Sequence, residues 1–389
     1  MREREWQIGI TGTFDVENYG DMLFPIIAEA ELRERLGRVR MHPFSYSAKT
    51  PPDWPYAVRS VAELPQALDA LDAMLIGGGF LVRFDKLVAE NYGPPSAEIH
   101  HPTGYWLTPA LMAAARGIPV AWNAPGMHCN DIPLWAEPLL RLALAGSAYV
   151  SVRDEPSGEA LAPYAEPGRV RVVPDSGFGL GRLIPAEESA EMQRVREVAD
   201  LRKPYIVVQP VRWADDGFPA FLQQNASRFA SYQLLGLPMG PVLGDSVSFF
   251  GDALPHFTWL PFWPSPLLLA EIIGNAAAVI GYSYHLVITA LAAGVPAFAS
   301  FDQSVGKFTA LSRFETLYRL ASINEAAPDV FFSRLGRTEP APSVRATLPP
   351  LARHWDEIAK TVEGGRGVPH PAFASFWQSL PNLLENPSR

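Results

Sequence analysis

Short apolar runs that alternate with segments of helical spacing constrain the fold of this chain most. Each run is typical of a buried strand, and the segments between them carry apolar residues at i, i+3 and i+4. The predicted strands are residues 6–12, 39–44, 73–76, 120–124, 149–152 and 170–173 in the first half, and 205–209, 233–237, 257–260, 277–281 and 297–301 in the second. Strands that alternate with helices predict parallel, doubly wound sheets.

The chain contains two such series. Residues 183–203 are charged and helical in pattern, so we interpret them as a helix that connects two domains. The prediction is an α/β fold with two Rossmann-like domains, residues 1–182 and 204–338, and a Pro-rich and helical C-terminal extension, residues 339–389. A length of 389 residues suits two or three cores. Ligands bind at the carboxyl ends of strands in such sheets, so we expect the site in the cleft between the domains.

The composition excludes several classes of protein. Hydrophobic residues make up 48% of the chain and charged residues 19%, which is typical of packed globular cores rather than disorder. The net charge of −9 argues against a nucleic-acid-binding surface, because phosphate backbones attract basic surfaces. The single cysteine, Cys129, excludes an internal disulfide framework. His100-His101 and His128-Cys129 lack the spacing of metal ligands, so we expect no metal site.

Targeting signals are not expected. The charged start of the chain is followed by an apolar stretch that is too short and too Gly-rich for a signal peptide. Residues 276–300 are apolar enough to resemble a membrane helix, but they contain His285 and Pro296, so we predict a strand, a turn, a helix and a strand. We therefore expect a cytoplasmic protein without a transmembrane segment, peripheral to the inner face of the membrane if its substrate is lipid-linked.

Polar residues and glycines at the ends of the predicted strands are the candidate site residues. They are Asn18, Gly20, Asp21, Gly77, Gly78, Gly79, Arg153, Asp175, Arg212, Ser283, His285 and Lys307. Glycine amides can face an anion, and a histidine that opens a helix can donate a proton or bind an anion. Structural alternatives are a helix cap for Asp21, a tight turn for the glycines, a surface ion pair for Arg153-Asp154 and a hydrogen-bonded core position for His285. The sequence contains no G-x-G-x-x-G motif after its first strand and no Walker lysine motif.

Taken in order over residues 12–308, these segments resemble the polysaccharide pyruvyl transferase family. The similar segments are Asn18-Tyr19-Gly20-Asp21 (N-x-G-D), residues 75–79 (a strand and three glycines), residues 116–120 (a Gly-x-Pro strand entry), residues 150–154 (V-S-x-R-D), residues 173–175 (P-D), residues 281–285 (the histidine motif) and Lys307. Within the histidine motif, Ser283 and Leu286 occupy positions where many members carry arginine and glycine. We therefore expect the site to have one anion ligand fewer, and we expect less room for a ligand to approach the start of the helix that follows.

The resemblance implies a glycosyltransferase-B-like enzyme that uses phosphoenolpyruvate as donor. Such an enzyme builds a pyruvate ketal on two hydroxyls of a sugar, glycan or lipid-linked saccharide, without a metal or other cofactor. On this reading His285 is the general acid, and Asp21 or Asp175 orients a hydroxyl or accepts its proton. The expected ligands of the substrates are Asn18 and Ser283 for oxygens, and Gly20, Gly77, Gly78, Gly79, Arg153, Arg212 and Lys307 for the donor and its anionic groups.

Three other functions start from the same residues. Gly281-Tyr282-Ser283 is half of a G-x-S-x-G elbow, which would indicate a serine hydrolase. A nucleotide-sugar-dependent glycosyltransferase would share the architecture. A non-catalytic family member would keep the fold and lose the chemistry. Trp213, Trp259 and Trp263 follow predicted strands of the second domain, where their rings can stack on sugar faces.

Overall fold

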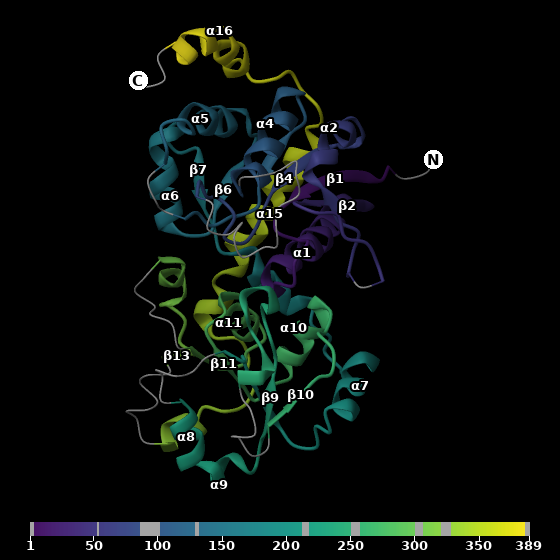
Figure 1. Cartoon of the computed structure of the whole chain (residues 1–389), viewed down its shortest axis with the longest axis vertical. Coiled ribbons are helices and arrows are strands. Elements are labelled where there is room, and N and C mark those ends of the chain that lie inside the picture. Colours follow the sequence, from purple (N-terminus) through teal and green to yellow (C-terminus); the bar gives the residue numbers. More distant parts are fainter. Residues whose placement is uncertain are drawn as a thin grey trace. The chain divides into compact units, whose positions relative to one another are not determined.

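The computed structural model describes residues 4–52, 54–85, 102–128, 132–211, 218–249, 257–299, 306–319 and 328–385. Contacts between residues divide the chain into two compact units (Figure 1). The first unit consists of Met1–Val16, Phe24–Ser176 and Pro349–Arg389, and the second of Glu17–Leu23 and Gly177–Leu348. The chain therefore passes into the second unit for one short segment near its start before the first unit is complete.

The first unit contains a five-stranded parallel sheet. Its strands are β1 (Trp6–Thr11), β2 (Val39–Ser45), β3 (Arg59–Ser60), β4 (Ala73–Ile76) and β5 (Val120–Trp122), in the order β3-β2-β1-β4-β5. Strands β6 (Val150–Val152) and β7 (Val170–Val172) pair with each other, and a bridge between Ala121 and Tyr149 connects them to β5. The strand order reverses between β1 and β4, which is where ligands bind in doubly wound sheets.

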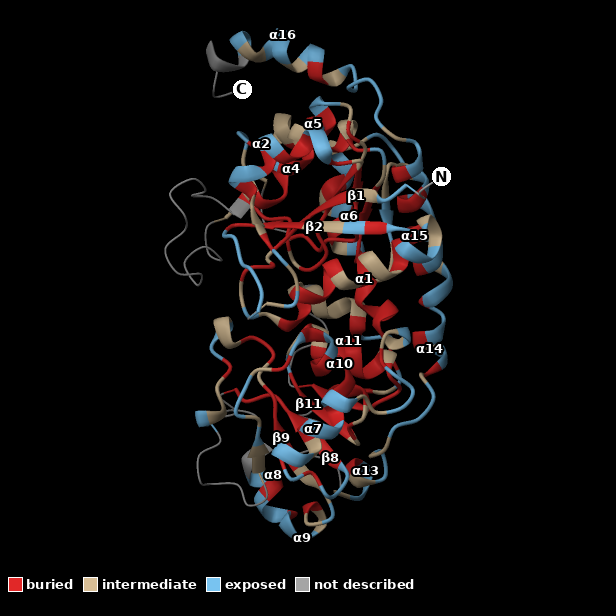
Figure 2. Cartoon of the chain, turned by 90° about the vertical axis from the view of Figure 1, so that its right-hand side faces the viewer, coloured by how far each residue is buried: buried red, intermediate tan, exposed pale blue. Residues whose placement is uncertain are grey.

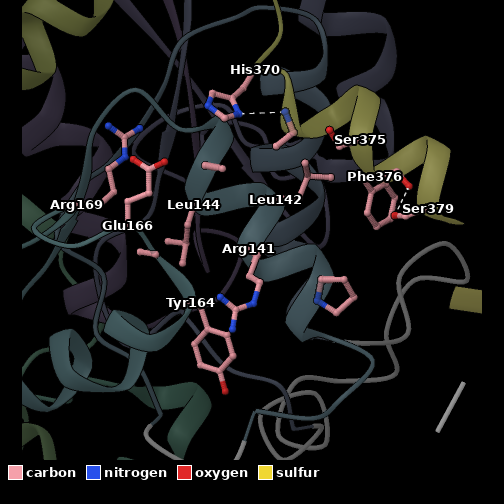
Figure 3. Close-up of a pocket in the computed structure, with 14 residues that line it drawn as sticks. Arg141, Leu142, Leu144, Tyr164, Glu166, Arg169, His370, Ser375, Phe376 and Ser379 are labelled. Atoms are coloured by element: carbon pink, nitrogen blue, oxygen red, sulfur yellow. Dashed lines mark hydrogen bonds between the residues drawn. The ribbon is translucent and has the colours of Figure 1, made fainter. Parts of the chain in front are cut away.

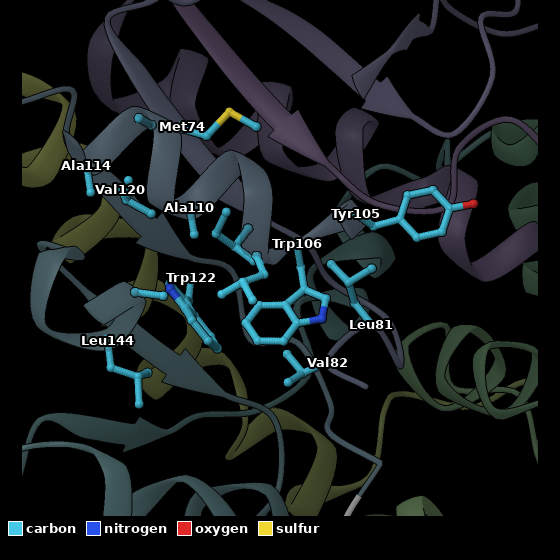
Figure 4. Packing of buried hydrophobic residues seen from close by; sticks show 14 of the residues in the cluster. Met74, Leu81, Val82, Tyr105, Trp106, Ala110, Ala114, Val120, Trp122 and Leu144 are labelled. Carbon is cyan, nitrogen blue, oxygen red and sulfur yellow. The ribbon is translucent and has the colours of Figure 1, made fainter. Parts of the chain in front are cut away.

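Helices and an aromatic core complete the first unit. The helices are α1 (Tyr19–Leu36, which begins in the second unit), α2 (Leu64–Ala67), α4 (Leu107–Ala115), α5 (Glu137–Gly146), α6 (Glu155–Leu161), α15 (Leu348–Glu363) and α16 (Ala372–Glu385). Trp106 and Trp122 meet edge to face with ring centroids 5.8 Å apart (Figure 4). The indole of Trp122 donates to the Ser147 hydroxyl at 3.0 Å, so this buried ring keeps its hydrogen bond.

The C-terminal segment is anchored to the first unit by backbone contacts. The guanidinium of Arg366 donates to the carbonyls of Leu68 and Leu71, and the amide of Gly367 donates to the Gly117 carbonyl at 2.8 Å. A side chain at Gly117 would overlap Gly367, so the close approach requires glycine there. Pro349–Arg389 are thus part of the first unit, whereas the sequence predicts a separate extension over residues 339–389.

The second unit is built around a six-stranded parallel sheet. Its strands are β8 (Tyr205–Val208), β9 (Gln233–Gly236), β10 (Phe257–Trp259), β11 (Ala278–Gly281), β12 (Ala297–Ala299) and β13 (Leu317–Arg319), in the order β10-β9-β8-β11-β12-β13. Its helices are α7 (Ala190–Val198), α8 (Phe218–Gln224), α9 (Ala226–Phe229), α10 (Pro266–Gly274), α11 (Tyr284–Ala292), α13 (Pro328–Phe332) and α14 (Pro342–Arg345). Helices α10 and α11 are buried over most of their length (Figure 2). The strand order reverses between β8 and β11.

The structure confirms the predicted α/β class with two Rossmann-like sheets and a helical C-terminal end. Of the apolar residues 276–300, those up to residue 299 are described, and they form β11, α11 and β12, as predicted. No helix in the described part of the chain is long and apolar enough to cross a membrane. The helix expected over residues 183–203 is shorter: α7 begins after Ser189, whose hydroxyl accepts from the Met192 amide, and it lies in the second unit. Strands β3 and β13 were not predicted, because β3 consists of two polar residues and only one of the three residues of β13 is buried.

Candidate active site

The three glycines lie at the point of strand reversal in the first unit. The amide of Gly77 donates to the carbonyl of Thr11, the last residue of β1, at 2.9 Å. Gly77, Gly78 and Gly79 all adopt positive φ values of 72°, 116° and 70°, and a side chain at Gly78 would also overlap the ring of Phe24. The turn therefore requires glycine on conformational grounds alone. An anion-binding role for these amides remains a prediction.

A buried cluster of charges follows strands β6 and β7. The guanidinium of Arg153 lies 3.2 Å from Asp175 through Nη1 and 3.5 Å from Asp154 through Nε. The Arg153 and Asp175 side chains are each 1% exposed. Phe80, the residue after the glycines, has its ring centroid 5.4 Å from the guanidinium carbon. Arg153-Asp154 is therefore not a surface ion pair, and the structural alternative based on exposure is wrong.

The V-S-x-R-D segment contacts the loops that follow β4, β5 and β7, and its own last residues form the loop after β6. Asp154 caps α6, because its Oδ1 accepts from the Ser157 amide at 2.9 Å, and the Ser157 hydroxyl accepts from the Met127 amide at 2.9 Å. Gly126 lies against the Arg153 guanidinium, and its amide donates to the Gly79 carbonyl at 2.7 Å. The structure thus brings the glycine loop, Arg153 and Asp175 together, as the sequence predicts for neighbouring strand ends.

His285 lies in the first turn of α11, directly after the reversal point of the second unit. Gly20 packs against its imidazole so closely that a Cβ at Gly20 would overlap the ring at Nδ1. The Tyr19 hydroxyl is hydrogen-bonded to Thr289 at 2.8 Å, and burial raises the pKa of Tyr19. His285 and Thr289 are four residues apart and share one face of α11. The N-x-G-D segment and the histidine motif therefore form one packed structure.

Asn18 and Asp21 are paired beside this contact. The Asn18 amide nitrogen donates to Asp21 Oδ2 at 2.9 Å, and both side chains are partly exposed. Helix α1 begins at Tyr19, so Asp21 lies within its first turn and does not cap it, contrary to the structural alternative. A carboxylate in the first turn of a helix is favoured by the helix dipole.

A buried glutamine that was not among the predicted site residues holds the histidine loop, residues 282–283. Gln209 follows β8 and is 3% exposed. Its Oε1 accepts from the amides of Tyr282 at 3.0 Å and Ser283 at 2.9 Å, and its Nε2 donates to Asp245 at 2.9 Å. The Ser283 hydroxyl makes no capping bond to α11. The side chain of Gln209 therefore fixes the backbone that leads into His285.

Asp245 extends this network to the N-x-G-D segment. Its Oδ2 also accepts from the amides of Met239 at 2.7 Å and Gly240 at 3.0 Å, and the Met239 carbonyl accepts from the Tyr19 amide at 2.8 Å. Burial raises the pKa of Asp245, and its hydrogen bonds oppose that rise. Gln209 was recognisable as a polar residue directly after an apolar strand. Asp245 lies in a loop whose sequence carries no comparable signal.

Asp15 is a second missed carboxylate. It follows β1 in the first unit and is 6% exposed. Its oxygens accept from the Ser45 hydroxyl at 2.6 Å and from the Ser47 amide at 2.7 Å, so it ties the loop after β1 to the end of β2. Burial raises the pKa of Asp15. These contacts give Asp15 a structural role, because they connect the ends of two strands, and this role explains why it is buried.

Of the remaining candidate residues, some are placed by the structure and others lie outside the described residues. Lys307 lies in a 3-10 helix, Gly306–Leu311, with Nζ 5.2 Å from the Phe308 ring. Leu286 is fully buried against Gly281, so the expectation that it narrows the approach to the helix start is wrong. Arg212, Trp213, Cys129 and His100-His101 lie outside the described residues. Among the described residues, no group of three or more His, Cys, Asp and Glu side chains is placed to hold a metal ion.

The two tryptophans described in the second unit differ in exposure. Trp259 ends β10 and is 48% exposed. Trp263 is partly buried and its indole donates to the Pro238 carbonyl at 2.9 Å. Trp259 therefore presents a ring to solvent at the carboxyl end of a strand, whereas Trp263 is held by the neighbouring loop.

The two parallel sheets with their helices form a glycosyltransferase-B-like fold. The structure is similar to UDP-GlcNAc 2-epimerase from Neisseria meningitidis bound to UDP-GlcNAc (TM-score 0.55, 11% identity, 92% of this chain and 100% of that one). It is also similar to the UDP-GlcNAc 2-epimerase of Methanocaldococcus jannaschii (0.53, 12%, 83% and 92%) and to a trehalose-phosphate synthase from Burkholderia xenovorans (0.52, 11%, 92% and 100%). At these identities the likeness shows the fold alone.

The amino-acid sequence shows which protein family the chain belongs to. The model of the polysaccharide pyruvyl transferases matches residues 18–301, and the chain belongs to that family. The match begins at Asn18 and includes the glycine loop, the Arg153 segment and the histidine motif. No curated protein matches the sequence.

Proposed function

We propose that this chain transfers the pyruvyl group of phosphoenolpyruvate to two hydroxyls of a sugar in a polysaccharide or its precursor. The observation that carries the proposal is the packing of Gly20 against His285 and of Tyr19 against Thr289. Two segments separated by more than half of the chain, both inside the family match, thereby form one local structure. Such a fixed imidazole is what a proton-transfer step requires.

The reaction needs one proton donor and one proton acceptor. Protonation of the methylene carbon of phosphoenolpyruvate produces a methyl group and an oxocarbenium-like centre at the carbon that carries the phosphate ester. One sugar hydroxyl adds to this centre, the carbon–oxygen bond to phosphate breaks, and a second hydroxyl completes the ketal. Two hydroxyl protons are lost and one is taken up by carbon, so the remaining proton leaves with phosphate or solvent.

His285 is the proposed general acid. It is partly exposed, it lies in the first turn of a nine-residue helix, and its ring orientation is fixed by Gly20. The positive end of the helix dipole favours an anion nearby, which suits a phosphorylated donor. Ser283, in the same loop, is the proposed hydrogen-bond partner of a substrate oxygen.

Asp21 is better suited than Asp175 to orient a hydroxyl or accept its proton. Asp21 is partly exposed and its neighbour Asn18 holds one of its carboxylate oxygens. Asp175 is 1% exposed and its carboxylate faces Arg153. A base must reach the proton that it removes, so we assign this role to Asp21 and a supporting role to Asp175.

Arg212, Lys307 and the glycine loop are the proposed ligands of the phosphate and carboxylate of the donor. Arg153, whose side chain is 1% exposed, has the proposed role of positioning these ligands, because its buried ion pairs hold the loops after β6 and β7. The exposed ring of Trp259 is the proposed contact for a sugar face. The reaction as written requires no metal and no other cofactor, and we propose that it takes place in the cytoplasm.

The test compares His285→Asn with wild type in a phosphate-release assay that contains phosphoenolpyruvate and a panel of saccharides, with the ketal product identified by mass spectrometry. We expect kcat to fall by a factor of about 100 or more, the usual contribution of a positioned general acid. His42→Gln, which changes a partly buried histidine of β2, is the matched control and should keep full activity. Substantial kcat in a folded His285→Asn variant would contradict the assignment.

A further inference from the structure

A cavity of about 840 Å³ lies in the first unit between α5 and α16 (Figure 3). Its walls are residues 138–145 of α5, residues 164–169 and residues 370–379. Helix α5 leads into β6, and residues 164–169 lead into β7. The cavity therefore lies at the amino ends of these two strands, whereas Arg153 and Asp175 follow their carboxyl ends. It belongs to no part of the site described above.

Two arginines give the cavity a positive wall. Arg141 donates to the Pro163 carbonyl at 3.0 Å, and its guanidinium lies 5.0 Å from the ring centroid of Tyr164. Arg169 donates to the Ser147 carbonyl. No carboxylate in the described part of the chain forms an ion pair with either arginine. Glu166 also lines the cavity, so two guanidiniums against one carboxylate leave a local charge of +1 in a chain whose net charge is −9.

The rest of the cavity wall is mainly apolar. Leu142 and Leu144 of α5 are buried beneath it, and Ala372 and Phe376 of α16 line it as well. Helix α16 is held in place by Phe373, whose ring packs directly on Gly146 at the end of α5. The volume is within the range of small-molecule sites, which are typically apolar with a few placed polar groups.

His370 adds a further polar group to the rim. Its Nδ1 accepts from the Ala372 amide at 3.2 Å (Figure 3). In the neutral ring the proton is therefore on Nε2, which is a donor. Donors from Arg141, Arg169 and His370 thus face the same cavity as the leucine and phenylalanine side chains.

We propose that this cavity binds an amphiphilic anion, with a phosphate or carboxylate head at Arg141 and Arg169 and a hydrocarbon chain against Leu142, Ala372 and Phe376. Planar guanidiniums suit such heads because they donate paired hydrogen bonds. A small polar anion would leave the apolar wall in contact with water, and a neutral amphiphile would leave both charges unused. The site is independent of pyruvyl transfer.

Calorimetric titration with monomeric dodecyl phosphate tests the proposal. Wild type should bind saturably, and the double variant Arg141→Gln/Arg169→Gln should bind at least about tenfold more weakly, since each lost charged hydrogen bond is worth that much. Arg202→Gln changes an arginine of the second unit whose side chain is 83% exposed, and it should leave the affinity unchanged. Dodecyl maltoside and inorganic phosphate should each bind at least about tenfold more weakly than dodecyl phosphate.

No saturable binding by wild type, or equal affinity in the double variant, would overturn the proposal, as would equal binding of the maltoside or of inorganic phosphate. If the double variant does not fold, Phe376→Ala serves instead, because it removes apolar wall without removing charge. Its dodecyl phosphate affinity should fall while inorganic phosphate is unaffected. Co-sedimentation with phosphatidylcholine–phosphatidylglycerol vesicles identifies the source: binding that the double variant loses indicates a bilayer lipid, and its absence alongside dodecyl phosphate binding indicates a free amphiphile.

Discussion

The strand-end clusters of the two units are built from different interactions. In the first unit, Arg153 forms buried ion pairs with Asp154 and Asp175. In the second unit, His285 is held by packing against Gly20 and by a loop that Gln209 fixes through neutral hydrogen bonds. Buried charges are strongly coupled to folding, whereas a ring placed by packing is coupled to local geometry. We therefore expect the first cluster to determine stability and the second to determine turnover.

Arg153→Ala is the strongest test of this difference. Removing one partner of a buried ion pair leaves an uncompensated charge, so we expect the free energy of unfolding to fall by about 3–5 kcal/mol. His285→Ala should lower it by less than about 1 kcal/mol, because the residue as a whole is partly exposed, although its Nε2 is buried. Urea unfolding of both variants measures the two values. Similar small losses in both would remove the contrast between the clusters.

Gly20→Ala tests whether the second cluster depends on packing. The added Cβ overlaps the His285 ring, so the ring must move. We expect stability to fall by about 1–3 kcal/mol, as for other overpacked sites, and kcat to fall at least about tenfold. Gly364→Ala is the matched control, because a Cβ there meets its neighbours at 3.4 Å, an ordinary contact. Unchanged kcat in Gly20→Ala would show that the contact with His285 does not matter for turnover.

His354 of α15 is a buried counterpart of His285 in the first unit. Its Nε2 lies 3.1 Å from Asn123 Oδ1, and its Nδ1 lies 3.0 Å from the Tyr149 hydroxyl. Burial, together with the charge of Arg35, lowers the pKa of His354 from 6.5 to about 3. The unfolded chain therefore takes up a proton between these values while the folded chain does not, and stability is lost as the pH falls through this window.

The size of the stability loss on acidification follows from the two pKa values of His354, 6.5 in the unfolded chain and about 3 in the folded chain. Between pH 7 and pH 5 we expect the free energy of unfolding to decrease by about 2 kcal/mol through His354. His354→Gln should flatten the dependence, whereas His370→Gln, at an exposed position, should not. Chemical unfolding at several pH values measures the slope. An identical slope in wild type and His354→Gln would show that this histidine does not control acid stability.

Gln209→Met should produce the smallest of these effects on turnover. The variant keeps the length of the side chain and loses the bonds to the amides of Tyr282 and Ser283. We expect kcat to fall about tenfold, or about 1.4 kcal/mol, with a smaller change in KM, because His285 is then less well positioned.

Gln233 is the matched control for Gln209. Its Oε1 also accepts from two backbone amides, those of Arg202 and Lys203, but it lies at the amino end of β9. Gln233→Met should therefore cost stability and leave kcat unchanged. Equal losses of kcat in both variants would indicate a general effect on the sheet instead of a specific effect on the histidine loop.

The sequence predicted those elements and site residues that are marked by their immediate neighbours in the chain. Apolar runs and helix boundaries located most strands, and strand ends located the glycine loop, Arg153, Asp175 and His285. Long-range burial was not predictable: nothing local to Arg153-Asp154 indicates that Asp175 and Phe80 enclose the guanidinium. The same holds for Gly20, whose need for glycine comes from a ring 265 positions later in the chain. The position of the last helices also depends on contacts, since Gly367 and Phe373 meet residues of the first half.

Calorimetric titration with phosphoenolpyruvate tests the proposed donor most directly. Wild type should bind phosphoenolpyruvate saturably, and its melting temperature should rise with donor concentration, because the ligand stabilises the folded state. Arg153→Lys, which keeps the buried charge but not the planar guanidinium, should bind more weakly, and UDP-GlcNAc should compete poorly. Saturable binding of UDP-GlcNAc with no binding of phosphoenolpyruvate at millimolar concentration would contradict the proposed function.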